Sequence, residues 1–368
     1  MGLRDRYRRY EALTPQELSA QLRDEADTRR RTALDTVPPL DLRSTTWHEV
    51  PPSVVVDAVT FAARAGLHRY PHSDAPDLRN AIARMHDLRA ERIAVGEGAS
   101  QLLGAAAREL LSPGDELLTP WPSYPLYPTL ARRCGATVVP VPGFDPAALL
   151  AGVTDRTRLL LLCNPNDPTG DFLRAGELSA LLDALPERVV VLLDEALRDF
   201  VDAEDADAAL RLVDQHPRML VFRTFSKAWG LAGLRCGYVV GGPQSEPLLE
   251  QLSPPLGVGE LTQAGILEAL RQGRGLVARR AAQVTVERER LREALRGLPV
   301  EVTPSQAHVV WLAAPALDGA QLAGRLAQSK VLVLPGGPLG DPRHVRATLQ
   351  DADATDRLVR ALAEAVGA

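Results

Sequence analysis

Residues 224–238 read TFSKAWGLAGLRCGY and lie between two apolar runs that are typical of β-strands. Lys227 stands among hydroxyl, small and apolar residues, and a lysine in a partly desolvated pocket has a lowered pKa that suits a nucleophile or a base. Arg235 follows eight positions later, and with the hydroxyls of Thr224 and Ser226 it offers donors for a phosphate near the lysine. The alternative, a surface lysine and arginine on a glycine-containing turn, is disfavoured by the surrounding pattern.

Around this stretch, from about residue 77 to 240, short apolar runs alternate with longer stretches of 3.6-residue period. The first kind predicts strands and the second predicts helices. Strands that alternate with helices imply a mostly parallel sheet covered on both faces, which binds ligands beyond the carboxyl ends of its strands. The predicted strands lie near 92–96, 115–119, 136–141, 158–163, 188–193, 219–223 and 236–240, and the predicted helices near 77–90, 99–111, 123–133 and 174–185.

The rest of the chain predicts further helices and a second, smaller unit. Thr14-Pro15-Gln16-Glu17 is a capping box with proline at the first helical position, which predicts a helix over 14–31. Residues 260–296 predict a long charged helical segment with a candidate break at Gly273. A second α+β domain is predicted from strand-like runs at 300–303, 308–313, 331–334 and 345–349 and from helices near 318–329 and 354–367.

Three more motifs follow predicted strands. Gly96-Glu97-Gly98-Ala99-Ser100-Gln101 opens a helix, whose free amides and dipole favour a phosphate. Residues 163–170 read CNPNDPTG, for which an ordinary Asn/Pro turn is the alternative. Residues 192–197 read LLDEAL, so Asp194 ends a strand, where it serves either as partner of a protonated ring nitrogen or as a helix N-cap.

In this order, the four elements resemble the class I and II aminotransferases of fold type I, especially the histidinol-phosphate aminotransferase branch. The resemblance runs from about Leu67 to Leu349. It implies an α/β fold in which a large domain holds a mixed, mostly parallel seven-stranded sheet between helices, beside a smaller α+β domain. The implied parts are an N-terminal helical segment joining the small domain (1–50), a large cofactor-binding domain (51–257), and a linker helix with the C-terminal small domain (258–368).

The resemblance also implies the cofactor pyridoxal 5'-phosphate and a role for each matching residue. Lys227 would carry the cofactor as a Schiff base and then move a proton, and Asp194 would keep the ring nitrogen protonated, so that the ring acts as an electron sink. Arg346 would clamp the substrate carboxylate as a bidentate fork, with a solvated edge-strand arginine as the alternative. Ala99, Ser100, Thr224, Ser226 and Arg235 would hold the phosphate, Tyr124 would stack on the ring, and Tyr70 would reach the phosphate of a neighbouring subunit in a homodimer with shared sites.

Two positions depart from the family pattern at the cofactor. Asp167 stands where relatives have an asparagine that donates to the cofactor O3' oxygen, and an ionised aspartate cannot donate. Leu197 stands where many members have a tyrosine whose hydroxyl reaches the same oxygen. We therefore expect the proton of the lysine–cofactor linkage to be held more tightly, or to move towards O3' beside Asp167. Alternatively, Asn166 turns in and replaces the missing amide.

Other departures concern the substrate. Leu334 occupies the position where histidinol-phosphate enzymes carry an arginine that reads the substrate phosphate, and an apolar group there suits an uncharged side chain. The segment Thr45-Thr46-Trp47-His48-Glu49 also differs from their usual pattern. We expect a substrate other than histidinol phosphate, with Trp47 and His48 as candidates for the substrate pocket or, equally, as packing residues.

Composition limits the remaining possibilities. The 368 residues suggest about two domains, and the net charge of −5 gives no basic field for nucleic acid. Three separate cysteines indicate neither a disulfide framework nor a metal site. No signal peptide or membrane span is apparent, so a cytoplasmic protein without a membrane partner is expected.

The leading interpretation is amino-group transfer between an amino acid and a 2-oxo acid. The nearest rival is another pyridoxal-phosphate reaction at Cα on the same fold, such as decarboxylation of the threonine-phosphate decarboxylase kind. A third hypothesis is a non-catalytic cofactor-binding module. Retention of Lys227, Asp194 and Arg235 together argues against it, because a scaffold has no need of that set.

Overall fold

The structure, a computed structural model, describes residues 10, 13–35 and 37–367 and is built around a seven-stranded sheet. Its strands are β2 (Ile93–Gly96), β3 (Glu116–Trp121), β4 (Thr137–Pro142), β5 (Thr157–Cys163), β6 (Val190–Asp194), β7 (Met219–Thr224) and β8 (Gly237–Gly241). The spatial order is β2-β8-β7-β6-β5-β3-β4. Strand β8 is antiparallel to both of its neighbours, and all other pairs are parallel. The predicted mixed, mostly parallel sheet is confirmed.

Helices cover both faces of this sheet, which explains why its central strands read as unbroken apolar runs. In β5, Leu160 and Leu162 belong to one buried cluster, whereas Leu159 and Leu161 belong to the cluster on the other face. Helix α8 packs on the first cluster and α5 on the second. The helices of this part are α4 (Pro76–His86), α5 (Ala99–Leu110), α6 (Leu126–Arg133), α7 (Pro146–Ala151), α8 (Ala175–Ala184) and α9 (Glu246–Leu252).

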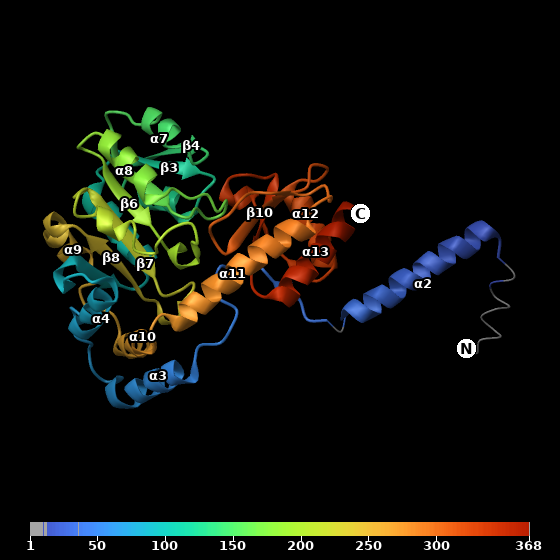
Figure 1. The fold of residues 1–368 in the computed structure, drawn as a ribbon, viewed down its shortest axis with the longest axis horizontal. Helices are drawn as coiled ribbons and strands as arrows, with labels where there is room; N and C mark the ends of the chain where they lie inside the picture. The colour runs from blue at the N-terminus through green and yellow to red at the C-terminus, as the bar shows by residue number, and fades with distance from the viewer. Residues whose placement is uncertain (1–9, 11–12, 36, 368) are drawn as a thin grey trace.

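A second, antiparallel sheet follows in the chain, in the order β12-β13-β10-β9. It consists of β9 (Glu301–Val302), β10 (Val309–Ala313), β12 (Leu334–Pro335) and β13 (His344–Thr348), with helices α12 (Gly319–Gln328) and α13 (Ala352–Val366). Helices α10 (Glu260–Gln272) and α11 (Gly275–Ala294) precede it, and α11 leads from the large sheet to this second unit (Figure 1). They are separated at Gly273, whose φ of 78° favours glycine, so the predicted break is present.

The N-terminal part reaches the second unit before it enters the first. Helix α2 (Pro15–Asp35) begins at the predicted capping box, where Glu17 N donates to Thr14 Oγ1 at 3.3 Å. It extends away from the rest of the chain (Figure 1). Strand β1 (Leu40–Asp41) then pairs in parallel with β11 (Val331–Leu332). Residues 1–9, 11, 12 and 36 of the predicted N-terminal segment lie outside the described residues.

Helix α3 (Ser53–Gly66) is not predicted by the sequence patterns. It follows two prolines and carries apolar residues on its exposed side as well as on its packed side. Its polar residues, Ser53, Asp57, Thr60 and Arg64, nevertheless recur at helical spacing, so the sequence does carry a signal for this helix. Val55 is buried, whereas Val56 and Phe61 are exposed. None of the helices within the described ranges is long and apolar enough to cross a lipid bilayer.

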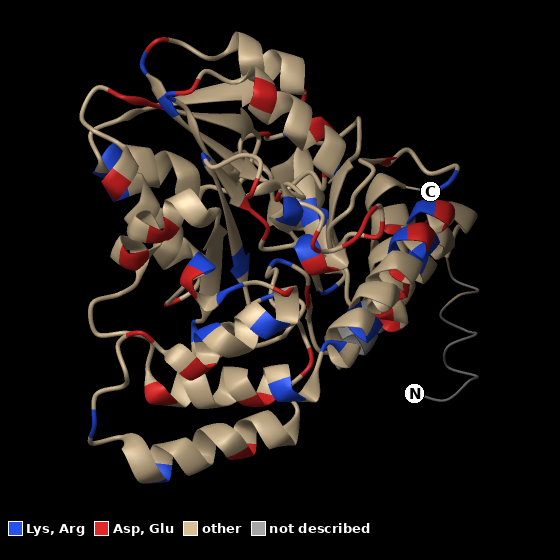
Figure 2. Cartoon of the chain, turned by 60° about the vertical axis from the view of Figure 1, so that its left-hand side comes forward, with Lys and Arg blue, Asp and Glu red and all other residues tan. Residues whose placement is uncertain are grey.

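Few charged residues lie on the strands of the large sheet, and most lie on the helices and loops around it (Figure 2). One of the exceptions, Arg223 on β7, belongs to an ion network with residues of the loop after β6 and of α4. Arg223 Nη2 lies 2.8 Å from Glu195 Oε2, and its Nη1 lies 2.6 Å from Asp207 Oδ1. His86 connects Asp207 to the hydroxyl of Tyr238 on β8. The network therefore joins β7 and β8 to the loop after β6 through mostly buried side chains, of which Asp207 is 24% exposed.

Replacing Glu195 with alanine should lower the free energy of unfolding by about 3–5 kcal/mol, because Arg223 would keep a buried charge with half of its partners. Urea denaturation followed by circular dichroism measures this. The matched control is Glu293→Ala, which breaks an exposed pair with Arg296 and should cost at most about 0.5 kcal/mol. Equal losses in the two variants would refute a stabilising role for the network.

Candidate active site

A cavity opens at the carboxyl ends of β5, β6 and β7, where a sheet of this kind binds ligands. Side chains from several separate segments line it, and they include most of the residues expected from the sequence. The expected residues that line the cavity are Ala99, Ser100, Tyr124, Asp167, Asp194, Thr224, Ser226, Lys227 and Arg235, and it is also lined by Leu197.

One end of the cavity is built to hold an anion. Helix α5 begins at Ala99, and no side chain caps its first turn, so its amides are free to donate to a ligand. Gly98 before it has a φ of 87°, and a Cβ atom there would lie 2.5 Å from Arg235 Nη2. The guanidinium therefore lies against the start of the helix. Thr224 Oγ1 donates to Ser226 Oγ at 3.0 Å in the same corner. Amides, hydroxyls and a guanidinium together suit a phosphate.

An acid and an amine line the middle of the cavity. Asp194 ends β6, where its Oδ2 accepts from the hydroxyl of Tyr127 at 2.9 Å and its Oδ1 accepts from the amide of Ala196 at 3.0 Å. Burial raises the pKa of Asp194 to about 6. Burial lowers the pKa of Lys227, whose amine donates to the hydroxyl of Thr45. A buried acid without a cationic partner suits a protonated ring nitrogen, and a lysine with a lowered pKa suits a nucleophile or base.

Asn166 does not turn towards the cavity. Its Oδ1 accepts from Ser123 Oγ at 2.7 Å, and its Nδ2 donates to Pro122 O at 3.0 Å and to Thr169 Oγ1 at 2.8 Å. These bonds use the amide to brace its own loop. Asp167 lines the cavity instead.

Arg346 lies behind Asp167 on β13. Its Nη1 donates to Asp167 Oδ1 at 2.7 Å, and its Nη2 donates to the carbonyl of Arg43 at 2.6 Å. Both side chains of the ion pair are only 7% exposed. The guanidinium predicted to bind a substrate carboxylate is therefore buried and is already paired with a carboxylate of the chain.

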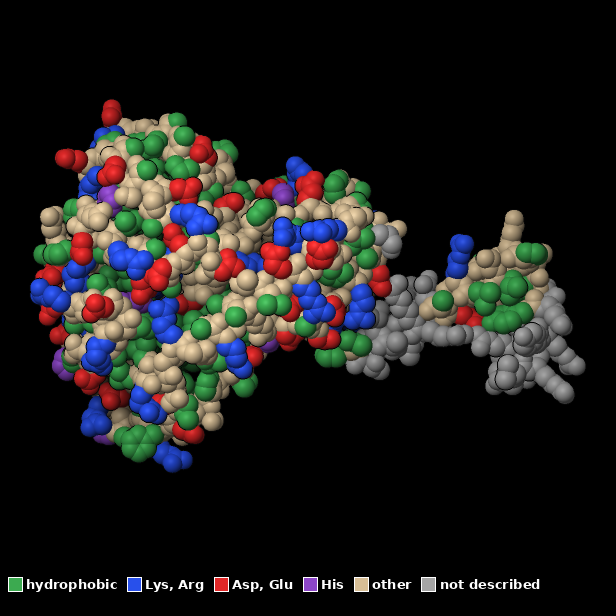
Figure 3. Space-filling model, in the orientation of Figure 1, with side chains coloured by type: hydrophobic (Ala, Val, Ile, Leu, Met, Phe, Trp, Pro, Cys, Tyr) green, Lys and Arg blue, Asp and Glu red, His purple; other side chains and the backbone are tan. Residues whose placement is uncertain are grey.

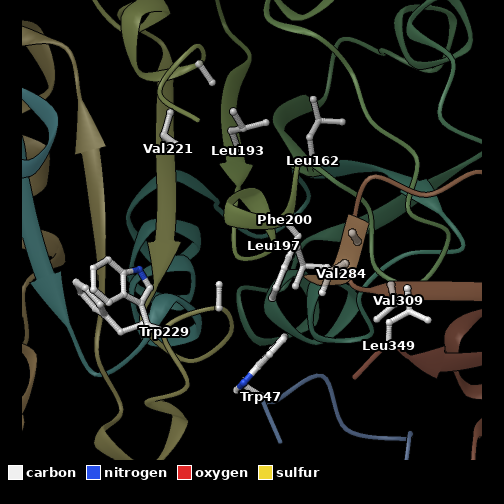
Figure 4. Packing of buried hydrophobic residues seen from close by; sticks show 14 of the residues in the cluster. Trp47, Leu162, Leu193, Leu197, Phe200, Val221, Trp229, Val284, Val309 and Leu349 are labelled. Atoms are coloured by element: carbon white, nitrogen blue, oxygen red, sulfur yellow. The ribbon is translucent and has the colours of Figure 1, made fainter. Parts of the chain in front are cut away.

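The remaining expected residues lie outside the cavity. Leu334 is opposite Arg346 in the β12–β13 pair. The Trp47 ring stacks on Phe200 at 6.1 Å, and Figure 4 shows it directed into the buried cluster. The Nε2 atom of His48 lies 3.8 Å from Asp351 Oδ2. The expectation that Trp47 and His48 line the substrate pocket is therefore not supported by their placement, because the fold uses them in packing and at the surface.

Tyr70, predicted to act in a neighbouring subunit, is 83% exposed and lies outside the cavity of its own chain.

The neighbouring threonines take the place expected for Trp47 and His48. Thr46 lines the cavity, and Thr45 contacts Lys227. His308 holds Thr45 in place by donating from Nε2 to its carbonyl at 2.8 Å, and burial lowers the pKa of this imidazole to about 3. His308 and Tyr127 were not predicted. A signal for Tyr127 existed, since it lies three residues after Tyr124 within the predicted helix 123–133, although in the structure α6 begins only at Leu126. Nothing local marks His308.

Comparison with known proteins gives one consistent family. Residues 41–366 match the family described as aminotransferase class I and II. The aromatic amino acid aminotransferase of Corynebacterium efficiens is 39% identical over 84% of this chain and 89% of that protein. The histidinol-phosphate aminotransferase of Erythrobacter litoralis is 38% identical over 81% and 83%. A crystal structure of histidinol-phosphate aminotransferase from Sinorhizobium meliloti in complex with pyridoxal-5'-phosphate has a TM-score of 0.80 and 25% identity, covering 92% of this chain and 94% of that one.

Replacing Asp194 with asparagine should stabilise the cofactor-free protein above pH 6. The folded pKa of about 6 exceeds the ordinary value of 3.8, so the folded state binds the proton more tightly and wild-type stability falls as pH rises from 4 to 6. At pH 8 the variant should gain on the order of 2 kcal/mol, and at pH 4 little or nothing. Urea denaturation of both proteins at the two pH values measures this, and a variant that is less stable at pH 8 would contradict it.

Proposed function

The chain belongs to the class I and II aminotransferases, which use pyridoxal 5'-phosphate to move an amino group between an amino acid and a 2-oxo acid, and from that premise we propose that its substrates are aromatic amino acids and that it works as a homodimer. The observation that carries the substrate proposal is the lining of the cavity. Within the described part of the chain, Lys227 and Arg235 are the cations that line it, and each has a place in the cofactor site.

The residues present fit the cofactor. The amides at the start of α5, the hydroxyls of Thr224 and Ser226, and Arg235 would bind its phosphate, and Asp194 would face its ring nitrogen. When bound, the cofactor supplies a ring that withdraws electrons from the substrate Cα. We assign Asp194 to keep a proton on the ring nitrogen, and Tyr127 and the amide of Ala196 to hold the carboxylate in place.

Lys227 is assigned both the covalent attachment and the proton transfer at Cα. Its lowered pKa leaves a larger share of the amine neutral at physiological pH, which a base requires. Thr45 accepts a hydrogen bond from this amine, and His308 fixes the carbonyl of Thr45. Tyr124 forms a wall of the cavity next to Asp194 and would lie against the cofactor ring.

The remaining wall favours an apolar substrate side chain. Leu334 lies opposite Arg346 but outside the cavity lining, at a position where the resemblance implies an arginine in histidinol-phosphate enzymes. Within the cavity itself, Leu197 is apolar. A substrate phosphate would lose its hydration there without a cation to replace it, which is costly. An aromatic ring has no such cost. The identity to aromatic amino acid aminotransferases supports the same choice.

A donor screen tests the substrate proposal. Phenylalanine and tyrosine should convert the bound cofactor to pyridoxamine phosphate with a kcat/KM about 100-fold above that of histidinol phosphate, because an unpaired phosphate is strongly rejected. Loss of the cofactor absorbance measures the rate. The variant Leu334→Arg should lower the ratio of kcat/KM for aromatic donors to kcat/KM for histidinol phosphate. Preference for histidinol phosphate in the unaltered enzyme would refute the proposal, and release of carbon dioxide would indicate decarboxylation instead.

The homodimer proposal rests on an apolar surface over α3 and the loop that follows it. Phe61 is 73% exposed and Tyr70 83%, and large exposed apolar side chains gathered over one segment favour an interaction site. Apolar side chains are visible there at the lower edge of the molecule (Figure 3). The surface consists of Val50, Val54, Val56, Phe61, Leu67, Tyr70 and Leu256. A second copy seated on it would bring Tyr70 out of solvent and towards the neighbouring site.

Mixing two inactive variants tests the shared site. Lys227→Ala lacks the base and Tyr70→Ala lacks the phosphate contact, so each homodimer should be impaired. Subunit exchange would create hybrid dimers with one intact site, which restores about a quarter of the wild-type activity when the two variants are mixed equally. Light scattering gives the mass in parallel. A monomer in solution, or no recovery after exchange, would refute the shared site.

A further inference from the structure

The ion pair between Asp167 and Arg346 stands between the cavity and the guanidinium. Asp167 lines the cavity, whereas Arg346 is not among its lining residues. The guanidinium already donates to Asp167 Oδ1 and to the carbonyl of Arg43. A ligand that enters the cavity therefore meets a carboxylate of the chain before it meets the arginine.

A second carboxylate cannot join this pair at little cost. The pair is neutral as a whole, so it attracts an incoming anion weakly, and two carboxylates on one buried guanidinium repel each other. Among the described residues, Arg346 Nε has no hydrogen-bond partner, so the guanidinium keeps a donor for a new ligand. That atom is buried and Arg346 does not line the cavity, so a ligand carboxylate would contact the guanidinium only by displacing Asp167, whose charge must then be relieved.

On the basis of the proposed function, we propose that Asp167 makes carboxylate binding proton-coupled. The substrate carboxylate takes over the guanidinium of Arg346, and the carboxyl group of Asp167 takes up one proton from solvent and becomes neutral. No covalent bond other than that O–H bond forms. The neutral acid is a hydrogen-bond donor, as is the asparagine that relatives have at this position, so the donor is present only when a carboxylate is bound. Asp167 is thereby a specificity-determining residue for the substrate carboxylate.

The charged groups around Asp167 determine whether its ionised or its neutral form is favoured. Arg346 on β13 and Lys227 after β7 are the cations that stabilise its ionised form. Asp194 at the end of β6 opposes that form, as would ionised Tyr124 or Cys163. When a ligand carboxylate takes over Arg346, Lys227 is the remaining facing cation within the described residues.

Calorimetry on the holoenzyme tests the proposal with 3-phenylpropionate, an aromatic carboxylate that has no amino group to transfer. Titrations near pH 8 in buffers of different ionisation enthalpy give the number of protons taken up. The absorbance of the bound cofactor counts any proton taken up at the lysine–cofactor linkage, which is subtracted. The unaltered enzyme should take up about one further proton per site, and its affinity should fall about tenfold per pH unit.

Asp167→Asn should abolish this further proton uptake, and at pH 8 it should bind 3-phenylpropionate at least about tenfold more tightly. Asp171→Asn, an acid of the same loop outside the cavity lining, is the matched control and should behave like the unaltered enzyme. Arg346→Ala should lose binding in either background. The pH dependence of the unaltered enzyme stands as a test that needs no variant.

The possible failures separate the two proposals. If aromatic donors react but Asp167→Asn takes up the same number of protons or binds no more tightly, the coupling is refuted and the proposed function stands. If 3-phenylpropionate binds to neither protein and aromatic donors do not react, the proposed substrate class is wrong, and the coupling falls with it.

Discussion

The site depends on one constraint, which is that parallel strands end together at one edge of a sheet. The register pairs Cys163 of β5 with Asp194 of β6, and β7 ends beside them at Thr224. Buried apolar clusters on both faces fix this register, because a slip by one residue would exchange the two faces of every strand. Burial then acts on the groups at the edge. It raises the pKa of Asp194 and lowers that of Lys227, so the packing that stabilises the sheet also sets the chemistry beyond it.

The second unit and the N-terminal segment complete the site from the opposite side. The pairing of β1 with β11, together with the bond from Thr348 N to Leu42 O at 2.9 Å, ties the N-terminal segment to the smaller sheets. A few residues later, that segment brings Thr45 to Lys227, and β13 brings Arg346 to Asp167. Residues that touch the cofactor site thus come from segments separated by up to three hundred positions. Relative movement of the two units would alter the amine and the carboxylate-binding arginine together.

Sequence patterns predicted those features of the fold and the site that depend on residues close together in the chain. The seven strands and the uncapped start of α5 follow from periodicity and from a turn before a helix, which are local properties. Helix α3 was not predicted, although its polar residues recur at helical spacing, because apolar residues also lie on its outer face and weaken the contrast between the two faces. Trp47 and His48 were expected either to line the substrate pocket or to pack, and in the structure Thr46 lines the cavity and Thr45 contacts Lys227. Which side of an irregular segment faces a cavity is decided by anchors such as His308, which lies far away in the sequence.

This chain has Asp167 where relatives have asparagine, and the role of the aspartate depends on its partner, Arg346. Read alone, the aspartate is a lost donor. In the structure, its anion neutralises a buried guanidinium, and a buried cation without a partner would be strongly destabilising. Asp167 therefore stabilises the fold in the absence of a substrate carboxylate, and the same contact opposes the carboxylate that Arg346 is placed to receive. The ion pair between Asp167 and Arg346 therefore increases the stability of the ligand-free fold and decreases the affinity for a carboxylate ligand. Leu197 brings no hydroxyl to the cavity, so it does not supply the donor that a tyrosine at this position would supply.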